Sequence, residues 1–141
     1  MTRRALREIA ASKKRPLYTT PLSGNDVFLV EFARAEARYR AARAFAMEVF
    51  TAAQAAARED GGVPSLLLGR IRQATTWAHE EARAVLDFCH AWAGSDGFRE
   101  PSALGRCLRD TRVAVTHIFV DPITMVDAGK ALIADLNGHA E

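Results

Sequence analysis

One histidine stands in a run of apolar residues toward the C-terminal end of the chain. This residue, His117, lies between Val113 and Val120, where its neighbours are mostly aliphatic. An imidazole can donate, accept or exchange a proton near neutral pH, so it suits a reaction site. A histidine in such a run also serves as a hydrogen-bonded structural residue. The pattern alone leaves both interpretations open.

A short turn of mostly small residues could bind a phosphate group. Gly94-Ser95-Asp96-Gly97 follows an apolar helical segment and precedes Pro101, where another helix is predicted to begin. Backbone N–H groups in such a turn can bind an anion. Glycine after a helix is also a common C-terminal cap. The turn lacks the Gly-x-Ser-x-Gly spacing of a nucleophilic serine, so we expect no chemistry of that kind.

Basic side chains gather in two places. Lys14 and Arg15 close an N-terminal segment in which six of the first 15 residues are Lys or Arg and one is Glu. Arg109 belongs to an Arg106-x-x-Arg109-Asp110 pattern farther along the chain. Cationic side chains are the ordinary partners of phosphates. Apolar residues at helical spacing run through the N-terminal segment, so we interpret it as an amphipathic helix and expect no nucleic-acid partner.

Side chains that could bind a metal do not form a complete motif. Asp87-x-x-His90 is half of the pattern that a di-iron bundle needs from several helices, and we interpret it as two surface residues. His79-Glu80 lacks the second histidine of a His-Glu-x-x-His site. We therefore expect no metal.

Apolar residues at three- and four-residue steps predict five helices and no strand. Alanine, the best helix former, supplies 27 of the 141 residues. On the outer face of the second helix, Glu36/Arg40 and Glu31/Arg34 are spaced for ion pairs. Caps and breakers set the ends. The predicted helices run over about residues 3–14, from Ser23 or Asn25 to 59, from Pro64-Ser65 to 93, from Pro101 through 118, and from Asp121-Pro122 to Asn137-Gly138.

The predicted fold class is all-α, an antiparallel up-down bundle of four to five helices in a single domain covering residues 1–141. Helices this long leave apolar surface uncovered, so we expect a homo-oligomer, either a dimer or a tetramer. Cys89 and Cys107 are interpreted as reduced core thiols. No apolar run is long enough for a membrane span and no signal-peptide pattern opens the chain, so we expect a soluble, cytoplasmic protein.

The order of these features resembles the C-terminal helical domain of the acyl-CoA dehydrogenase superfamily. It is most similar to the branch that contains flavin-dependent monooxygenases. The resemblance covers about residues 3–136. It rests on Lys14-Arg15 after a first helix, two long helices, the Gly94–Gly97 turn with Phe98, the Arg106-x-x-Arg109-Asp110 helix and His117.

The resemblance implies an FAD or FMN cofactor lying between this bundle and a β-barrel domain. That barrel and an N-terminal helical domain would come from further domains or from a partner chain. Lys14 or Arg15 would face the flavin pyrophosphate of a neighbouring subunit. His117 would be the catalytic group, hydrogen-bonded to the flavin or the substrate. The other implied cofactor-binding residues are Gly94, Ser95, Gly97 and Arg109.

Three departures from the family pattern narrow the function. Ser95 replaces the second glycine of the family's pair, and Ala91 stands where a glutamine is common. No carboxylate follows the Arg-Asp helix before Asp121, so the base of an acyl-CoA dehydrogenase is missing. His117 instead suits the monooxygenase branch. We expect a partial flavoprotein domain that is inactive alone, or alternatively a non-catalytic helical oligomerisation module that has lost flavin chemistry.

Overall fold

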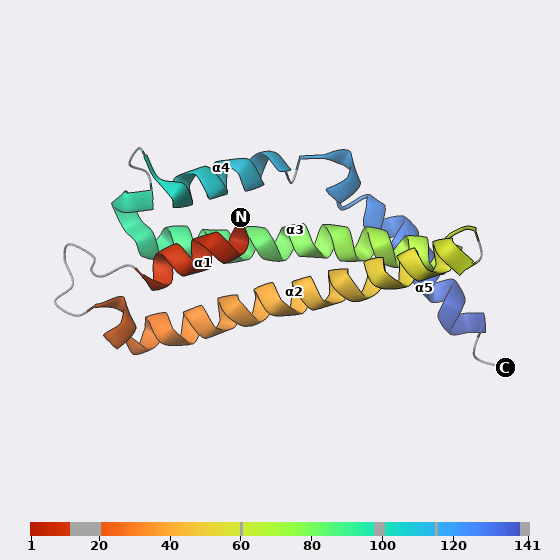
Figure 1. Ribbon diagram of the computed structural model, residues 1–141, viewed down its shortest axis with the longest axis horizontal. Coiled ribbons are helices and arrows are strands. Elements are labelled where there is room, and N and C mark those ends of the chain that lie inside the picture. The colour runs from red at the N-terminus through yellow and green to blue at the C-terminus, as the bar shows by residue number, and fades with distance from the viewer. Residues whose placement is uncertain (12–20, 60, 98–100, 115, 139–141) are drawn as a thin grey trace. The chain divides into compact units, whose positions relative to one another are not determined.

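The computed structural model describes residues 1–11, 21–59, 61–97, 101–114 and 116–138, with only the backbone of Asp96 and Phe119. This part of the chain forms five α-helices and no strand, which confirms the all-α helical bundle. The α-helices are α1 (Thr2–Ala10), α2 (Asp26–Glu59), α3 (Ser65–Ala93), α4 (Ala103–Ala114) and α5 (Thr124–Gly138), with 3-10 turns η1 (Leu22–Gly24), η2 (Gly94–Gly97) and η3 (Ile118–Val120) (Figure 1).

Side-chain caps fix the starts of α2 and α4. The Asn25 Oδ1 atom accepts a hydrogen bond from the Phe28 N–H at 3.0 Å, so α2 begins where the sequence predicts. The Ser102 Oγ atom accepts from the Gly105 N–H at 3.0 Å, so α4 begins at Ala103. The predicted start at Pro101 is therefore wrong by two residues, because the serine after the proline is the capping residue.

The other helix ends follow the sequence to different degrees. Gly61 (φ 68°) and Gly94 (φ 59°) adopt the left-handed backbone that follows a helix, and α2 and α3 end at the predicted positions. α5 begins after a turn in which Asp121 Oδ1 accepts from the Ile123 N–H at 2.9 Å. α1 ends at Ala10, so the predicted end at about residue 14 is wrong, and Lys14 and Arg15 themselves lie outside the described residues.

The chain forms two compact units that share the long helices α2 and α3. The first unit comprises residues 1–40 and 80–114, and the second comprises residues 41–79 and 115–141. The division into two compact units does not test whether the chain is a single domain, so the single domain stays a prediction. The apolar residues whose spacing predicts α2 and α3 point inward, since each of them is buried or half-buried. On α2 they are Phe28, Phe32, Ala35, Tyr39, Ala42, Phe45 and Val49, and on α3 they are Leu67, Ile71, Ala74, Ala78, Val85, Phe88 and Trp92.

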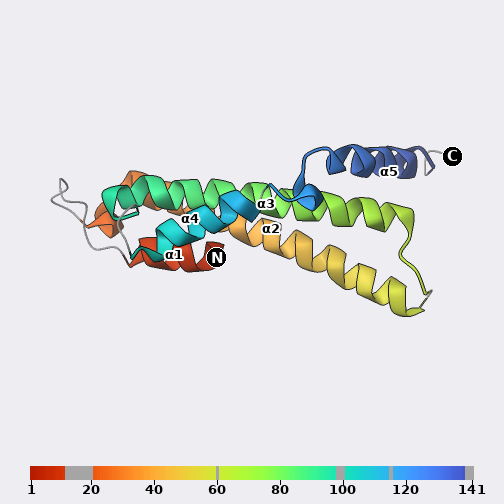
Figure 2. The same ribbon diagram turned by 90° about the horizontal axis from the view of Figure 1, so that it is seen from above.

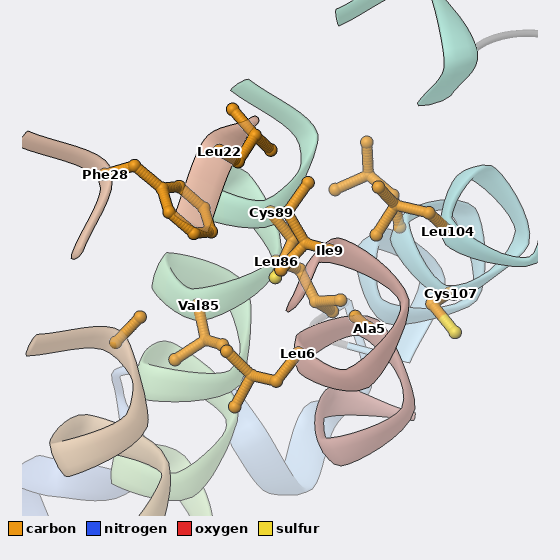
Figure 3. Close-up of a cluster of buried hydrophobic side chains, with 12 residues drawn as sticks. Ala5, Leu6, Ile9, Leu22, Phe28, Val85, Leu86, Cys89, Leu104 and Cys107 are labelled. Carbon is orange, nitrogen blue, oxygen red and sulfur yellow. The ribbon is translucent and has the colours of Figure 1, made fainter. Parts of the chain in front are cut away.

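The core of the first unit gathers apolar side chains from α1, η1, α2, α3 and α4 (Figure 3). Leu6 and Ile9 of α1 lie against the face of α3 that carries Val85, Leu86 and Cys89 (Figure 3). Each fully buried aliphatic side chain of this kind contributes about 1.5–3 kcal/mol to folding. α1 also runs beside α4 in both ribbon views (Figures 1 and 2), so one short helix ties two others together.

Four aromatic rings extend this core along α2 and α3. Phe28 lies 5.1 Å from Trp92 and 6.0 Å from Phe88 between ring centroids, and Phe32 lies 6.3 Å from Phe88. The Trp92 indole N–H donates to Glu31 Oε2 at 2.6 Å. The predicted Glu31–Arg34 pair is therefore wrong, because the half-buried Glu31 carboxylate accepts a hydrogen bond from the half-buried Trp92 indole instead. The predicted Glu36–Arg40 pair is confirmed.

One ion pair in the first unit has a buried partner. Glu81 is only 7% exposed, and its two carboxylate oxygens lie 3.1 and 3.3 Å from Arg38 Nη1. A carboxylate at this depth would be costly without a cation. The ion pair between Glu81 and Arg38 therefore links α3 to α2 across the interface of the two helices.

The second unit brings α5 against the first half of α3 through small residues. A Cβ atom at Gly69 would lie 3.0 Å from Ala131 Cβ and 3.5 Å from Ala128 Cα, so the two backbones approach closely there. The fully buried Thr76 hydroxyl lies 3.1 Å from the Thr124 hydroxyl. The absence of a side chain at Gly69 thus allows the backbones of α3 and α5 to approach each other closely.

The burial of Cys89 predicts an alkaline loss of stability. Burial, and then the neighbouring Cys107 thiol, raise the pKa of Cys89 from 9.0 to about 12. The pKa of Cys89 in the folded chain lies above its value in the unfolded chain. The stability that the buried, protonated thiol contributes to the fold is therefore complete below pH 9.0 and is lost as the pH rises toward about 12. Denaturation at several pH values should show a smaller alkaline loss in Cys89→Ala than in the unmodified chain. An identical pH dependence in both would contradict this account.

Candidate functional site

The turn η2 follows α3 directly and is shaped by its first glycine. Gly94 has a positive φ of 59°, which stops the helix and which a residue with a side chain rarely adopts. Ser95 is exposed, whereas Gly97 at the other end of the turn is buried. Both roles weighed for this turn thus stay compatible with its shape. The capping role is visible in the backbone, and Ser95 remains accessible to a ligand.

Gly97 is packed against a histidine of α3. A Cβ atom at Gly97 would lie 3.0 Å from His90 Cδ2 and 3.3 Å from His90 Nε2. His90 is half-buried, so the interpretation of Asp87 and His90 as a surface pair is correct for Asp87 and wrong for His90. The imidazole occupies the space that a side chain at position 97 would need. A larger residue at position 97 would need this imidazole to shift by a few tenths of an ångström.

The same turn touches α4 through a second glycine. A Cβ atom at Gly105 would lie 2.5 Å from the Gly97 carbonyl oxygen, a distance that real Cβ atoms do not reach. Arg109 Nη1 lies 3.5 Å from the same point. The structure therefore brings Gly97 and Arg109, two of the predicted site residues, close to Gly105 of α4.

A pocket of about 220 Å³ lies beside this region, between α1 and the start of α4. Among the lining residues that the structure describes, Glu8 alone is ionisable, so this described lining carries no cation. The pocket is lined by Glu8, Ile9, Ala93 and residues 101–104.

The remaining predicted residues are placed as follows. His117 belongs to the second unit, and its side chain is exposed just before η3. Its carbonyl oxygen accepts from the Val120 N–H at 2.9 Å. Lys14 and Arg15 lie outside the described residues. Within the described part, no three His, Cys, Asp or Glu side chains are grouped as metal ligands, and no helix is long and apolar enough to cross a membrane.

Sequence reasoning missed two residues of this region. Gly105 carries a signal that was available, since a glycine in the first turn of a helix is costly unless something packs on it. His90 carried a weaker signal, because its spacing from Val85, Leu86 and Cys89 places it beside their buried face. Neither position identifies its partner Gly97 without the three-dimensional arrangement.

The architecture is that of a known class of helical domain. A model of the family described as "Acyl-CoA dehydrogenase, C-terminal domain" matches residues 2–122. The chain therefore belongs to the family of acyl-CoA dehydrogenase C-terminal domains, which confirms the resemblance seen in the sequence. α5 follows the matched segment.

Among curated proteins, the chain is similar to an indole-3-acetate monooxygenase of Pseudomonas putida. The two are 32% identical over 100 residues, which is 71% of this chain and 26% of that protein. The aligned part thus spans about a quarter of the length of this relative.

Packing at Gly105 predicts a sharp contrast between two glycine substitutions. Gly105→Ala should lower the free energy of unfolding by about 1–3 kcal/mol, because the new methyl group overlaps the Gly97 carbonyl. Gly129→Ala is the matched control, since a Cβ atom there meets nothing within 4 Å. It should raise stability by about 0.5–1 kcal/mol. Denaturant unfolding measures both, and equal effects would contradict the proposed contact.

Proposed function

We propose that this chain forms one wall of a flavin site and acts in a flavin-dependent oxygenation. The observation that carries the proposal is membership of the acyl-CoA dehydrogenase C-terminal domain family, together with a relative named as a monooxygenase. The other walls would come from an N-terminal helical domain and a β-barrel domain, in further segments or in a partner chain. Alone, the chain would be inactive.

The flavin, FAD or FMN, would lie at the η2 end of the first unit and beside the basic segment after α1. Arg109, Lys14 and Arg15 would supply positive charge to its phosphates. Gly94 and Ser95 would approach with backbone and hydroxyl groups, since Ser95 is exposed. Gly97 would hold the turn in place through its packing against His90, since Gly97 is buried. These residues thus fit the phosphate end of the cofactor.

Reduced flavin, when bound, supplies the activation of molecular oxygen. The chain's own contribution would be His117, whose imidazole can donate a hydrogen bond or hold a proton beside the reacting groups. No carboxylate occupies residues 116–120, so proton abstraction from an acyl thioester lacks a base in this stretch. Oxygenation is therefore favoured over dehydrogenation. An aromatic acid is the substrate class that the name of the relative suggests.

The phosphate contacts predict selective flavin binding. FAD and FMN should bind the purified chain more tightly than riboflavin, which lacks phosphate, as measured by quenching of flavin fluorescence. Arg109→Gln should weaken FAD binding about tenfold, the effect of losing one charged hydrogen bond. Arg112→Gln, an exposed arginine on the same helix, is the control and should leave it unchanged. Equal binding of riboflavin and FAD would contradict a phosphate site.

A non-catalytic oligomerisation module is the second candidate, and α5 supports it. The helix packs on α3 through Thr124, Ala128 and Ala131, while three of its larger apolar residues, Val126, Ile133 and Leu136, are exposed. Ile133 is 62% exposed and Leu136 is 72% exposed. With Val126 these residues form one stripe at helical spacing, of the kind that marks a contact surface. We propose that this stripe contributes to a homo-oligomer, a dimer or tetramer.

The oligomer proposal predicts a mass change upon a single substitution. Ile133→Glu should lower the molar mass measured by light scattering to that of the monomer, because a carboxylate cannot be buried without a partner. Ala134→Glu adds the same charge at an exposed position beside the stripe and should leave the mass unchanged. A monomer in the unmodified chain, or loss of the oligomer in both variants, would count against the stripe.

A further inference from the structure

A hollow opens on the surface of the first unit between α2 and α3. Two polar links across the helices bracket it, Arg38 to Glu81 at one end and Glu31 to Trp92 at the other. Between these links the facing residues Ala35 and Ala84 leave space that larger side chains would fill. The volume of the hollow is about 280 Å³, and its lining residues are Glu31, Arg34, Ala35, Arg38, Ala84 and Phe88.

The hollow combines one available cation with one aromatic wall. Arg34 is exposed and forms no hydrogen bond or ion pair with any residue that the structure describes. Arg38 is engaged by the Glu81 carboxylate, and Glu31 accepts the Trp92 N–H. The half-buried Phe88 ring is held by its contacts with Phe28 and Phe32. The wall is therefore rigid and the cation is open.

We infer that this hollow binds a small aromatic carboxylate. The carboxylate would pair with the planar guanidinium of Arg34, which matches its geometry, and the ring would lie against Phe88. An apolar wall with one well-placed charge is the usual composition of a site for such a ligand. Glu31 and Arg34 line the same space, so Glu31 repels the ligand and keeps the site weak. The inference does not depend on the flavin proposal, because none of these residues belongs to it.

The experiment is a calorimetric titration of the full chain with naphthalene-2-carboxylate. Naphthalene-2-carboxamide, which has the same rings and no charge, is the control ligand. We expect saturable binding of the acid at millimolar concentrations or below, and about tenfold weaker binding of the amide. Arg34→Gln should weaken binding of the acid about tenfold and leave the amide unchanged. Arg43→Gln removes an exposed arginine outside the hollow and should change neither ligand.

Two further variants separate the charge from the shape of the site. Glu31→Gln keeps an acceptor for the Trp92 N–H and removes the repulsion, so the acid should bind more tightly. Ala84→Leu fills the hollow without a change of charge, so both ligands should be lost while the helical circular dichroism is preserved. Equal affinity for acid and amide, or insensitivity of the acid to Arg34→Gln, would overturn the inference.

Discussion

The first unit depends on the burial of one short stretch of α3. Val85, Leu86 and Cys89 are completely inaccessible, and the other helices of this unit contribute side chains to the core that they form. α1 is only nine residues long and would not be stable in isolation. Its helix persists because Ala5, Leu6 and Ile9 are buried in this core.

The helices were predictable because their determinants are local. Asn25 caps α2 as its type suggests, and glycines end α2 and α3 where the apolar periodicity stops. The error at the start of α4 arose because the prediction relied on Pro101, whereas Ser102 is the residue that caps the helix. The structure chooses the hydroxyl, which satisfies a backbone N–H that the proline cannot. Alternative helix starts of this kind lie within one turn of each other, and the packing of nearby residues decides between them.

The candidate site was less predictable, because its residues meet only through the fold. The sequence shows that the glycines of η2 end α3, but it does not show that His90 covers Gly97 or that Gly105 receives its carbonyl. The exchange of Arg34 for Trp92 as the partner of Glu31 has the same origin. Spacing along one helix favours Arg34, whereas in the structure the half-buried Trp92 on the facing helix donates its indole N–H to Glu31. Interactions between helices thus decide what periodicity leaves open.

The two links that bracket the hollow also fix how α2 and α3 are aligned along their length. Ala35 and Ala84 at the facing positions are too small to hold the two helices in register, so the larger groups on either side must do so. A slide by one helical turn, about 5.4 Å, would separate Arg38 from Glu81 and Glu31 from Trp92 together. The Glu81 carboxylate would then be buried without its counter-ion. The polar pairs, together with the ring contacts of Phe28 and Phe32 with Phe88 and Trp92, therefore select a single register for the two helices.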